Sequence, residues 1–157
     1  MALEKDVNSY TTVAEADAYF ADRLGSEKWT AADNTKKERA LITGSRALND
    51  YPWSGSAKST TLAFPRTGSY YDPALGYDVP MDPVPQRIIT ASLELALHLL
   101  TNPGVLSAQS SFDSISVGDI SLDYRSTMPS APPVVAKIIR PLLIAGGSAG
   151  DIWWRAN

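Results

Sequence analysis

The segment between Pro85 and Pro103 constrains the fold most strongly, because its apolar residues fall on two faces of a helix. At helical spacing one face carries Ile88, Leu95 and Leu99, and the other carries Ile89, Leu93 and Leu100. A helix that is apolar on two faces is buried by neighbours on both sides. The segment is too short to cross a bilayer, and Glu94 and His98 make it too polar. We therefore expect it to be the central helix of the fold.

Three further helices are predicted around this one. The first runs from about 13 to 24, because Thr12 and Glu15 form a capping-box pattern at its start. Its apolar face carries Val13, Ala16, Phe20 and Leu24. The second covers about 34–49, and the last follows Pro133. The pattern predicts a mainly α fold, a small bundle of about four helices with a long inter-helix loop and one β-hairpin.

The loop and the hairpin are placed by proline content and by alternation. Residues 51–82 are rich in proline and indicate one long loop between two helices. Residues 115–124 alternate apolar and polar residues around a glycine–aspartate pair, which predicts the hairpin. Its candidate contact residues are Val117, Gly118 and Asp119.

Length and composition fit one globular domain. The 157 residues are 44% hydrophobic and 20% charged. We assign residues 1–145 to a single helical domain and residues 146–157 to a glycine hinge and a C-terminal docking tail. The net charge of −3 gives no general basic footprint for nucleic acid. Cysteine is absent, and the first residues lack the features of a signal peptide.

No catalytic or metal-binding motif survives a check of its context. Gly146, Ser148 and Gly150 match the spacing of a nucleophile elbow, but the single histidine, His98, comes before them rather than after. His98 lies one helical turn from Glu94, and a metal site would need further converging ligands. We interpret His98 as a half-buried helix histidine near Glu94. We expect no enzyme activity, no metal and no cofactor.

The long loop carries an unusual set of residues, Trp53, Phe64, Pro65 and Arg66. Loops are normally polar, because their backbone stays near water. One interpretation packs these residues on the body of the protein or against a neighbouring subunit. The other has Trp53, Phe64 and Arg66 stack on the bases of a single strand, as aromatic and guanidinium groups do.

The C-terminal tail carries Ile152, Trp153, Trp154 and Arg155 beyond the glycine hinge. Exposed tryptophan pairs favour aggregation, while tryptophan and arginine are enriched in interface hot spots. We favour docking of this tail on a partner protein; folding back on its own domain is the alternative.

The order of several short motifs resembles a family of tailed-phage proteins. The motifs are Ser9–Val13, Ala16–Phe20, Trp29, Ala40–Ile42, Trp53–Gly55, Phe64–Arg66 and Val117–Asp119. The family consists of head–tail connector, or adaptor, proteins, often labelled DnaT-like single-stranded-DNA-binding proteins.

The resemblance implies a structural protein of the virion neck that is made in the host cytoplasm. It implies a homo-oligomeric, twelve-fold ring that joins the portal protein to a tail or head-closure protein. Genomic double-stranded DNA would pass through the lumen without sequence-specific binding, and no membrane would be involved. By the same resemblance, Ile152 to Arg155 would dock on the portal.

Two functions follow from the sequence. The first is the structural connector, and the alternative is a single-stranded-DNA-binding accessory protein of replication. Tight oligonucleotide binding that weakens steeply with salt would favour the alternative.

Overall fold

The computed structural model describes residues 2–103 and 131–144. Within these ranges it contains five α-helices and one antiparallel hairpin, which confirms the predicted mainly α bundle with one hairpin. The elements are α1 (Val13–Ala21), α2 (Glu27–Thr30), α3 (Asn34–Ala47), η1 (Leu48–Asp50), β1 (Ser69–Asp72), β2 (Tyr77–Pro80), α4 (Gln86–Thr101), α6 (Pro133–Ile139) and η2 (Arg140–Leu142). The short elements η1 and η2 are 3₁₀ helices.

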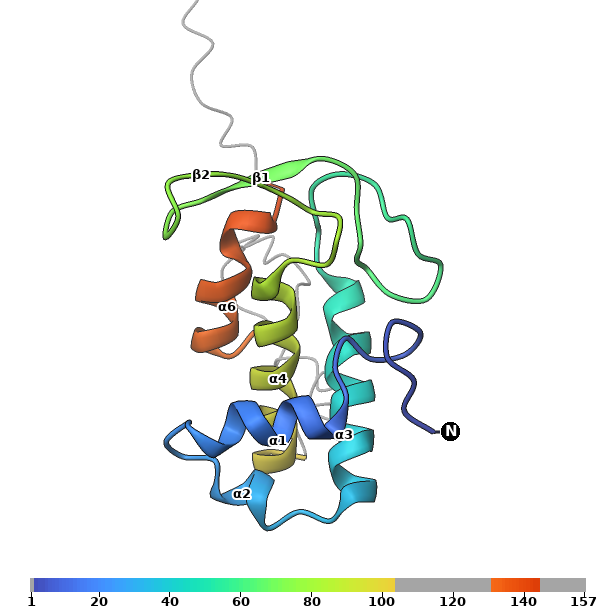
Figure 1. The fold of residues 1–157 in the computed structure, drawn as a ribbon, viewed down its shortest axis with the longest axis vertical. Helices are drawn as coiled ribbons and strands as arrows, with labels where there is room; N and C mark the ends of the chain where they lie inside the picture. The colour runs from blue at the N-terminus through green and yellow to red at the C-terminus, as the bar shows by residue number, and fades with distance from the viewer. Residues whose placement is uncertain (1, 104–130, 145–157) are drawn as a thin grey trace, which may run out of the picture.

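Helix α4 lies at the centre, as its two apolar faces predict. It packs between α3 and α6, and α2 contacts it near the end opposite the hairpin (Figure 1). Its side chains enter two buried clusters. Ile88 and Leu95 join the cluster nearer the hairpin, while Leu93 and Leu97 pack with Phe20 in the other. None of the helices in the described ranges is both long and apolar enough to cross a membrane.

Helix α3 approaches α4 closely because residue 44 is a glycine. A Cβ atom on Gly44 would lie 3.0 Å from the carbonyl oxygen of Ser92 and 3.1 Å from the backbone nitrogen of Ala96. Both atoms belong to the backbone of α4, so a larger residue would push the two helices apart. Asp33 begins α3, and its side chain accepts a hydrogen bond from the Lys36 amide at 2.8 Å.

Helix α1 begins as predicted but ends early. The Glu15 amide donates to Thr12 Oγ1 at 3.2 Å, and the Thr12 amide donates to the Glu15 carboxylate at 2.8 Å, so the capping box is formed. The helix stops at Ala21, and Gly25 takes a φ of +77° in the following turn. Placing Leu24 on the apolar face was therefore wrong, since its side chain is 96% exposed.

Residues 51–82 are more regular than the loop that proline content predicts. β1 and β2 form a hairpin inside this segment, with Tyr70 opposite Val79 and Tyr71 opposite Asp78. The turn between them is fixed at Asp72, whose carbonyl oxygen accepts from the amides of Leu75 and Gly76. The hairpin predicted at 115–124 lies outside the described residues.

The rest of the segment is held by backbone pairing on both sides. Lys58 and Thr67 donate from their amides to the carbonyl oxygens of Pro65 and Ser56, each at 2.9 Å. Ser54 donates to Leu142 at 3.1 Å, and Ile144 donates to Pro52 at 2.9 Å. The second pair joins residues far apart in the sequence. Because such pairing leaves no local pattern, the sequence alone predicts a loop here.

Candidate functional site

The aromatic residues of the long loop are buried. Trp53 and Phe64 are 4% and 1% exposed, and their rings meet edge to face with centroids 5.1 Å apart. The Trp53 indole N–H donates to the carbonyl oxygen of Leu48 at 2.6 Å. The Phe64 amide donates to the Tyr10 hydroxyl at 3.1 Å, and burial raises the pKa of that hydroxyl to about 12. These two rings pack on the helices and leave no face for a stacked base.

Arg66 holds the same loop in place by hydrogen bonds to carbonyl oxygens and not by an ion pair with a carboxylate. Its guanidinium donates to the carbonyl oxygens of Ser54 at 2.8 Å, Gly55 at 2.7 Å and Ala63 at 3.0 Å, and lies over the Phe64 ring. In the described part of the chain no acidic side chain pairs with it. Carbonyl groups satisfy hydrogen bonds but carry no net charge, so Arg66 keeps its positive charge. Pro65, the fourth predicted residue of this group, is partly buried beside it.

The exposed aromatic residues lie on the hairpin instead. Tyr71 is 58% exposed, Tyr77 is 59% exposed, and Leu75 in the turn between the strands is 54% exposed. Tyr77 pairs with Asp72, and Tyr71 with Asp78, so the two tyrosines project from opposite faces of the ribbon. We call these three side chains the hairpin platform.

An arginine–aspartate ion pair anchors the platform to the helices. The Arg87 guanidinium on α4 donates to the Asp72 carboxylate at 2.7 and 2.5 Å, and also to the carbonyl oxygen of Ile138 on α6 at 3.4 Å. The Tyr70 hydroxyl donates a further hydrogen bond to the Asp72 carboxylate at 3.3 Å. The Arg87 contact, with help from the Ala74 amide, holds the pKa of Asp72 well below its usual range. The hairpin is therefore fixed against both α4 and α6.

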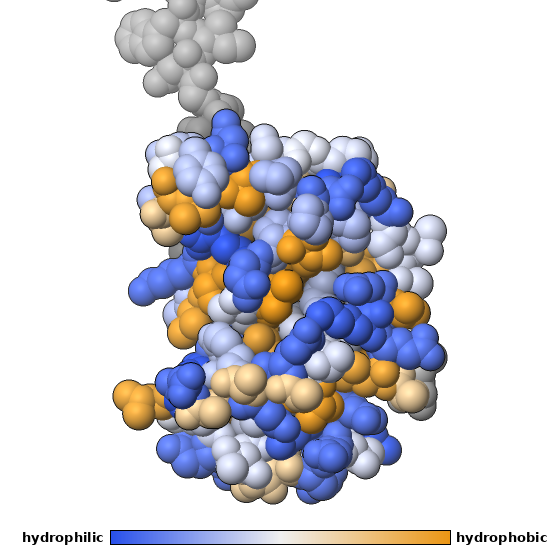
Figure 2. Space-filling model, in the orientation of Figure 1, coloured by the Kyte–Doolittle hydropathy of each residue, from blue (hydrophilic) through white to orange (hydrophobic). Residues whose placement is uncertain are grey.

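Two exposed cations lie on α6 and η2. Residues 131–144 contain no acidic side chain, and Lys137 and Arg140 are both exposed. Among the described residues neither forms an ion pair. Arg140 begins η2, which packs against β1 (Figure 1). Figure 2 shows hydrophobic and weakly hydrophilic side chains gathered beside strongly hydrophilic ones at the upper left, over the hairpin and α6. The segment 131–144 is therefore basic although the whole chain is acidic, whereas the hairpin carries the exposed carboxylate of Asp78.

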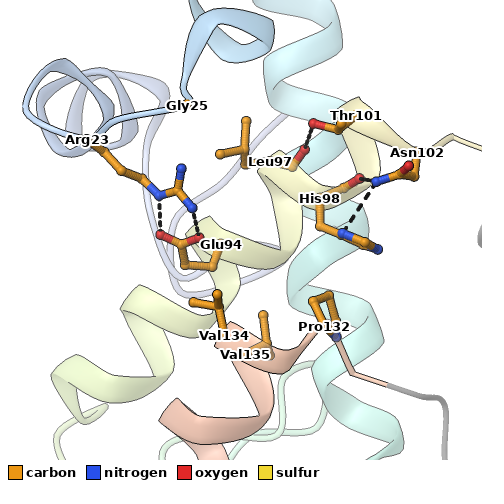
Figure 3. Close-up of a pocket in the computed structure, with 10 residues that line it drawn as sticks. All are labelled: Arg23, Gly25, Glu94, Leu97, His98, Thr101, Asn102, Pro132, Val134 and Val135. Carbon is orange, nitrogen blue, oxygen red and sulfur yellow. Dashed lines mark hydrogen bonds and ion pairs between the residues drawn. The ribbon is translucent and has the colours of Figure 1, made fainter.

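A pocket at the other end of α4 presents a different chemistry (Figure 3). The Arg23 guanidinium donates to both oxygens of Glu94, at 2.5 and 2.6 Å, and the Tyr19 hydroxyl donates to the same carboxylate at 2.8 Å. Burial, followed by that hydrogen bond, raises the pKa of Tyr19 to about 12. The His98 and Glu94 side chains form no hydrogen bond or ion pair with each other; His98 Nδ1 lies 3.5 Å from the Asn102 side-chain amide. Throughout the described ranges, no three histidine, aspartate or glutamate side chains gather as metal ligands.

Several sequence-predicted site residues lie outside the described residues. These are Val117, Gly118 and Asp119 of the predicted hairpin, and Ile152, Trp153, Trp154 and Arg155 of the predicted docking tail.

The sequence analysis missed Tyr71, Tyr77, Lys137 and Arg140. A signal for each pair was present. The tyrosines flank a turn that begins Asp72-Pro73, and the cations lie in a stretch without acidic residues.

The comparison with protein families gives one match. The model of a family described as "Putative DnaT-like ssDNA binding protein" matches residues 2–156. No curated protein and no solved structure matches the chain.

This match corrects the function drawn from the tailed-phage resemblance. The matching family is described by binding to single-stranded DNA, and nothing in the match indicates a structural connector. The predicted partners, a portal protein, a tail or head-closure protein and a twelve-fold ring around double-stranded DNA, are overturned with it. The predicted structural role in the virion is wrong for the same reason, and the alternative, a single-stranded-DNA-binding protein, is the one supported.

Proposed function

Since the chain belongs to this family of DnaT-like single-stranded-DNA-binding proteins, we propose that it binds single-stranded DNA as a replication accessory protein and catalyses no reaction. The observation that carries the proposal is the pair of exposed tyrosines, Tyr71 and Tyr77, on a hairpin whose strand β1 packs against η2, which begins with the exposed cation Arg140. This is the combination that proteins use to hold a single strand: aromatic faces for bases and cations for phosphates.

Exposed tyrosine rings favour a single strand over a duplex. A stacked base contributes about 1–3 kcal/mol and needs no particular sequence, because every base has an aromatic face. In a duplex those faces are already stacked on neighbouring bases. The platform therefore gains its stacking contacts only from unpaired nucleotides.

The acidic net charge does not conflict with this role. Lys137 and Arg140 stand three residues apart, at the end of α6 and the start of η2, in a stretch with no carboxylate of its own. Asp72 of β1 is neutralised by Arg87, which leaves Asp78 of β2 as the exposed carboxylate of the two strands. Two or three phosphate contacts predict a salt slope of about −1.4 to −2.1, which is shallow for a DNA-binding protein.

A titration of labelled oligo-dT of about 20 nucleotides, followed by fluorescence anisotropy at two salt concentrations, tests the proposal. We expect binding that weakens with salt and is tighter than binding to a duplex of the same length. Replacing Tyr71 and Tyr77 together by alanine removes both stacking surfaces and should weaken binding at least tenfold, since each stack contributes about 1–3 kcal/mol.

The matched control replaces the same two residues by phenylalanine. It keeps the rings and removes only the hydroxyl groups, so affinity should stay close to that of the unaltered protein. If the unaltered protein shows no binding to oligo-dT at low salt, the proposed function is wrong. If the alanine and phenylalanine variants bind equally well, the hairpin platform is not the site.

A further inference from the structure

A shallow groove beside Arg66 has a lining suited to an anion. Its polar lining side chains are Asn49, Tyr51, Ser59, Thr60, Thr61 and Arg66. Arg66 is the single charged member of the described lining, and Thr60 is exposed at the rim. A groove with one cation, several hydrogen-bonding groups and no carboxylate attracts a phosphate and excludes a cationic ligand.

Arg66 has donors left for such a ligand. A guanidinium carries five N–H groups, and Arg66 directs three of its hydrogen bonds to loop carbonyl oxygens. The nearby carboxylate of Asp82 is already paired with Lys58. The charge of Arg66 is thus held in place by the fold without being cancelled by it.

The groove is formed before any ligand arrives. Asn49 donates from its side chain to the carbonyl oxygen of Thr61 at 3.1 Å and accepts from the Ala63 amide at 2.7 Å. Ser59 Oγ accepts from the amides of Thr61 and Leu62, each at 3.2 Å. These bonds hold residues 59–63 in place beside Asn49, so ligand binding does not have to order this part of the loop.

The groove also continues the hairpin. The Arg66 amide donates to the carbonyl oxygen of Met81 at 3.1 Å, and the Met81 amide donates to Gly68 at 3.0 Å, which extends the β1–β2 pairing toward Arg66. Arg66 precedes Tyr71 by five residues, so their Cα atoms are at most about 18 Å apart. Single-strand binders commonly cover about 4–16 nucleotides per domain, which is enough to reach both.

We propose that the Arg66 groove is a phosphate subsite that holds the backbone of the single strand whose bases stack on the hairpin platform. The inference rests on the proposed function and adds a second contact to it. Arg66 then has two roles: it fastens the loop through carbonyl groups, and it contacts a phosphodiester with its remaining donors.

Charge changes at Thr60 test the subsite without disturbing Arg66. Thr60 is exposed and lines the groove. Thr60→Glu places a carboxylate at the rim and should weaken oligo-dT binding about fivefold, with a salt slope about 0.7 shallower because one phosphate contact is lost. Thr60→Lys should change both quantities in the opposite direction.

Ala31 provides the matched control. It is exposed at the end of α2, at the opposite end of the molecule (Figure 1). Ala31→Glu and Ala31→Lys make the same changes in net charge and should alter affinity by less than about twofold. If the Thr60 and Ala31 pairs give equal effects, the subsite is wrong. Because Thr60→Glu and Thr60→Lys are expected to act in opposite directions, a general loss of folding cannot imitate the result.

An abasic oligonucleotide separates the subsite from the platform. It keeps the phosphates and lacks the bases, so its weaker binding should respond to Thr60→Glu and not to the alanine changes at Tyr71 and Tyr77. Absence of binding to oligo-dT by the unaltered protein would overturn the proposed function itself. Normal oligo-dT binding that is lost in the tyrosine variants and unchanged by Thr60→Glu would overturn the subsite alone.

Discussion

Arg23 and Arg66 are two partly buried arginines at opposite ends of the molecule, and the protein uses them differently. Arg23 is bound by both oxygens of the buried Glu94, which cancels its charge. Arg66 is bound by three carbonyl oxygens, which leave its charge uncancelled. Hydrogen-bond satisfaction and charge neutralisation are therefore separate properties of an arginine. An arginine that has only the first can still attract an anion.

The surroundings of the two arginines differ in the same way, with an ion pair over the core at one end and exposed cations at the other. The Arg23 end is built from α1, α2 and the end of α4, and its ion pair lies over a buried cluster with Phe20 and Leu97. The Arg66 end adds exposed tyrosines and the cations of α6 and η2. We therefore expect changes at the first end to alter stability alone, and changes at the second to alter DNA binding.

Removing Glu94 should give the largest loss of stability. Glu94→Ala leaves the Arg23 guanidinium and the Tyr19 hydroxyl without their shared acceptor in a poorly solvated place, and should lower the free energy of unfolding by about 3 kcal/mol. Oligo-dT affinity should stay within about twofold, because the change lies at the opposite end from the hairpin platform. Urea unfolding and the anisotropy titration measure the two quantities.

Lys36→Ala is the control for the Glu94 experiment. It breaks the exposed Lys36–Asp33 pair at 3.1 Å, which should change the free energy of unfolding far less than Glu94→Ala does, because both side chains lie in water. If Glu94→Ala folds but binds DNA tenfold more weakly, then the Arg23 end affects DNA binding as well as stability, and the expected division is wrong.

Two glycines test whether the Arg66 end depends on a close backbone approach. Gly55 and Gly76 have φ values of +68° and +77°, so alanine carries a similar backbone strain at each. A Cβ on Gly55 would lie 2.1 Å from the Thr67 carbonyl oxygen, whereas a Cβ on Gly76 would meet nothing within 4 Å. We expect Gly76→Ala to cost about 1 kcal/mol and Gly55→Ala to cost about 2–3 kcal/mol, since only the latter adds a clash.

The two glycine variants should also differ in their affinity for oligo-dT. Gly55 supplies one of the carbonyl groups that hold Arg66, so Gly55→Ala should weaken oligo-dT binding through the Arg66 groove. Gly76→Ala lies beside Tyr77 in the hairpin turn, and its smaller strain should weaken binding less. Equal melting temperatures for the two variants would show that the loop moves easily to make room, and that the Arg66 groove is not rigid.

The helices were predictable because their signals are local. The two apolar faces of residues 85–103 placed α4, and the Thr12–Glu15 pair placed the start of α1. The end of α1 was not predictable from periodicity, because Leu24 continues the apolar pattern past the point where the chain turns.

The hairpin end was predicted poorly because its structure depends on distant partners. Trp53 pairs with Leu143, and Asp72 is held by Arg87, and neither contact leaves a periodic pattern in the sequence. The connector function failed for a related reason. The order of helices and aromatic motifs reports the fold, whereas the choice of partner depends on surface side chains, for which we propose Tyr71 and Tyr77.

The Arg87–Asp72 pair offers the finest test, because it resembles the Arg23–Glu94 pair in chemistry but lies at the hairpin. Arg87 lowers the pKa of Asp72, so the folded state favours the carboxylate. An unfolded aspartate titrates near about 3.9. The stabilisation is therefore complete above that pH and is lost as the pH falls through the lower, folded pKa. Arg87→Gln lacks this stabilisation. The difference in free energy of unfolding between the variant and the unaltered protein should therefore shrink as the pH falls below about 4.

Urea midpoints at pH 7, 4 and 3 for both proteins measure this convergence. Parallel midpoints at all three values would show that the ion pair does not set the pH dependence. Because the same pair holds the hairpin against α4 and α6, Arg87→Gln should also weaken oligo-dT binding by about two- to threefold through loss of preorganisation. Glu94→Ala should not weaken it, although it removes an ion pair of the same kind. If Arg87→Gln and Glu94→Ala weaken oligo-dT binding equally, the loss of affinity does not depend on how the hairpin is held.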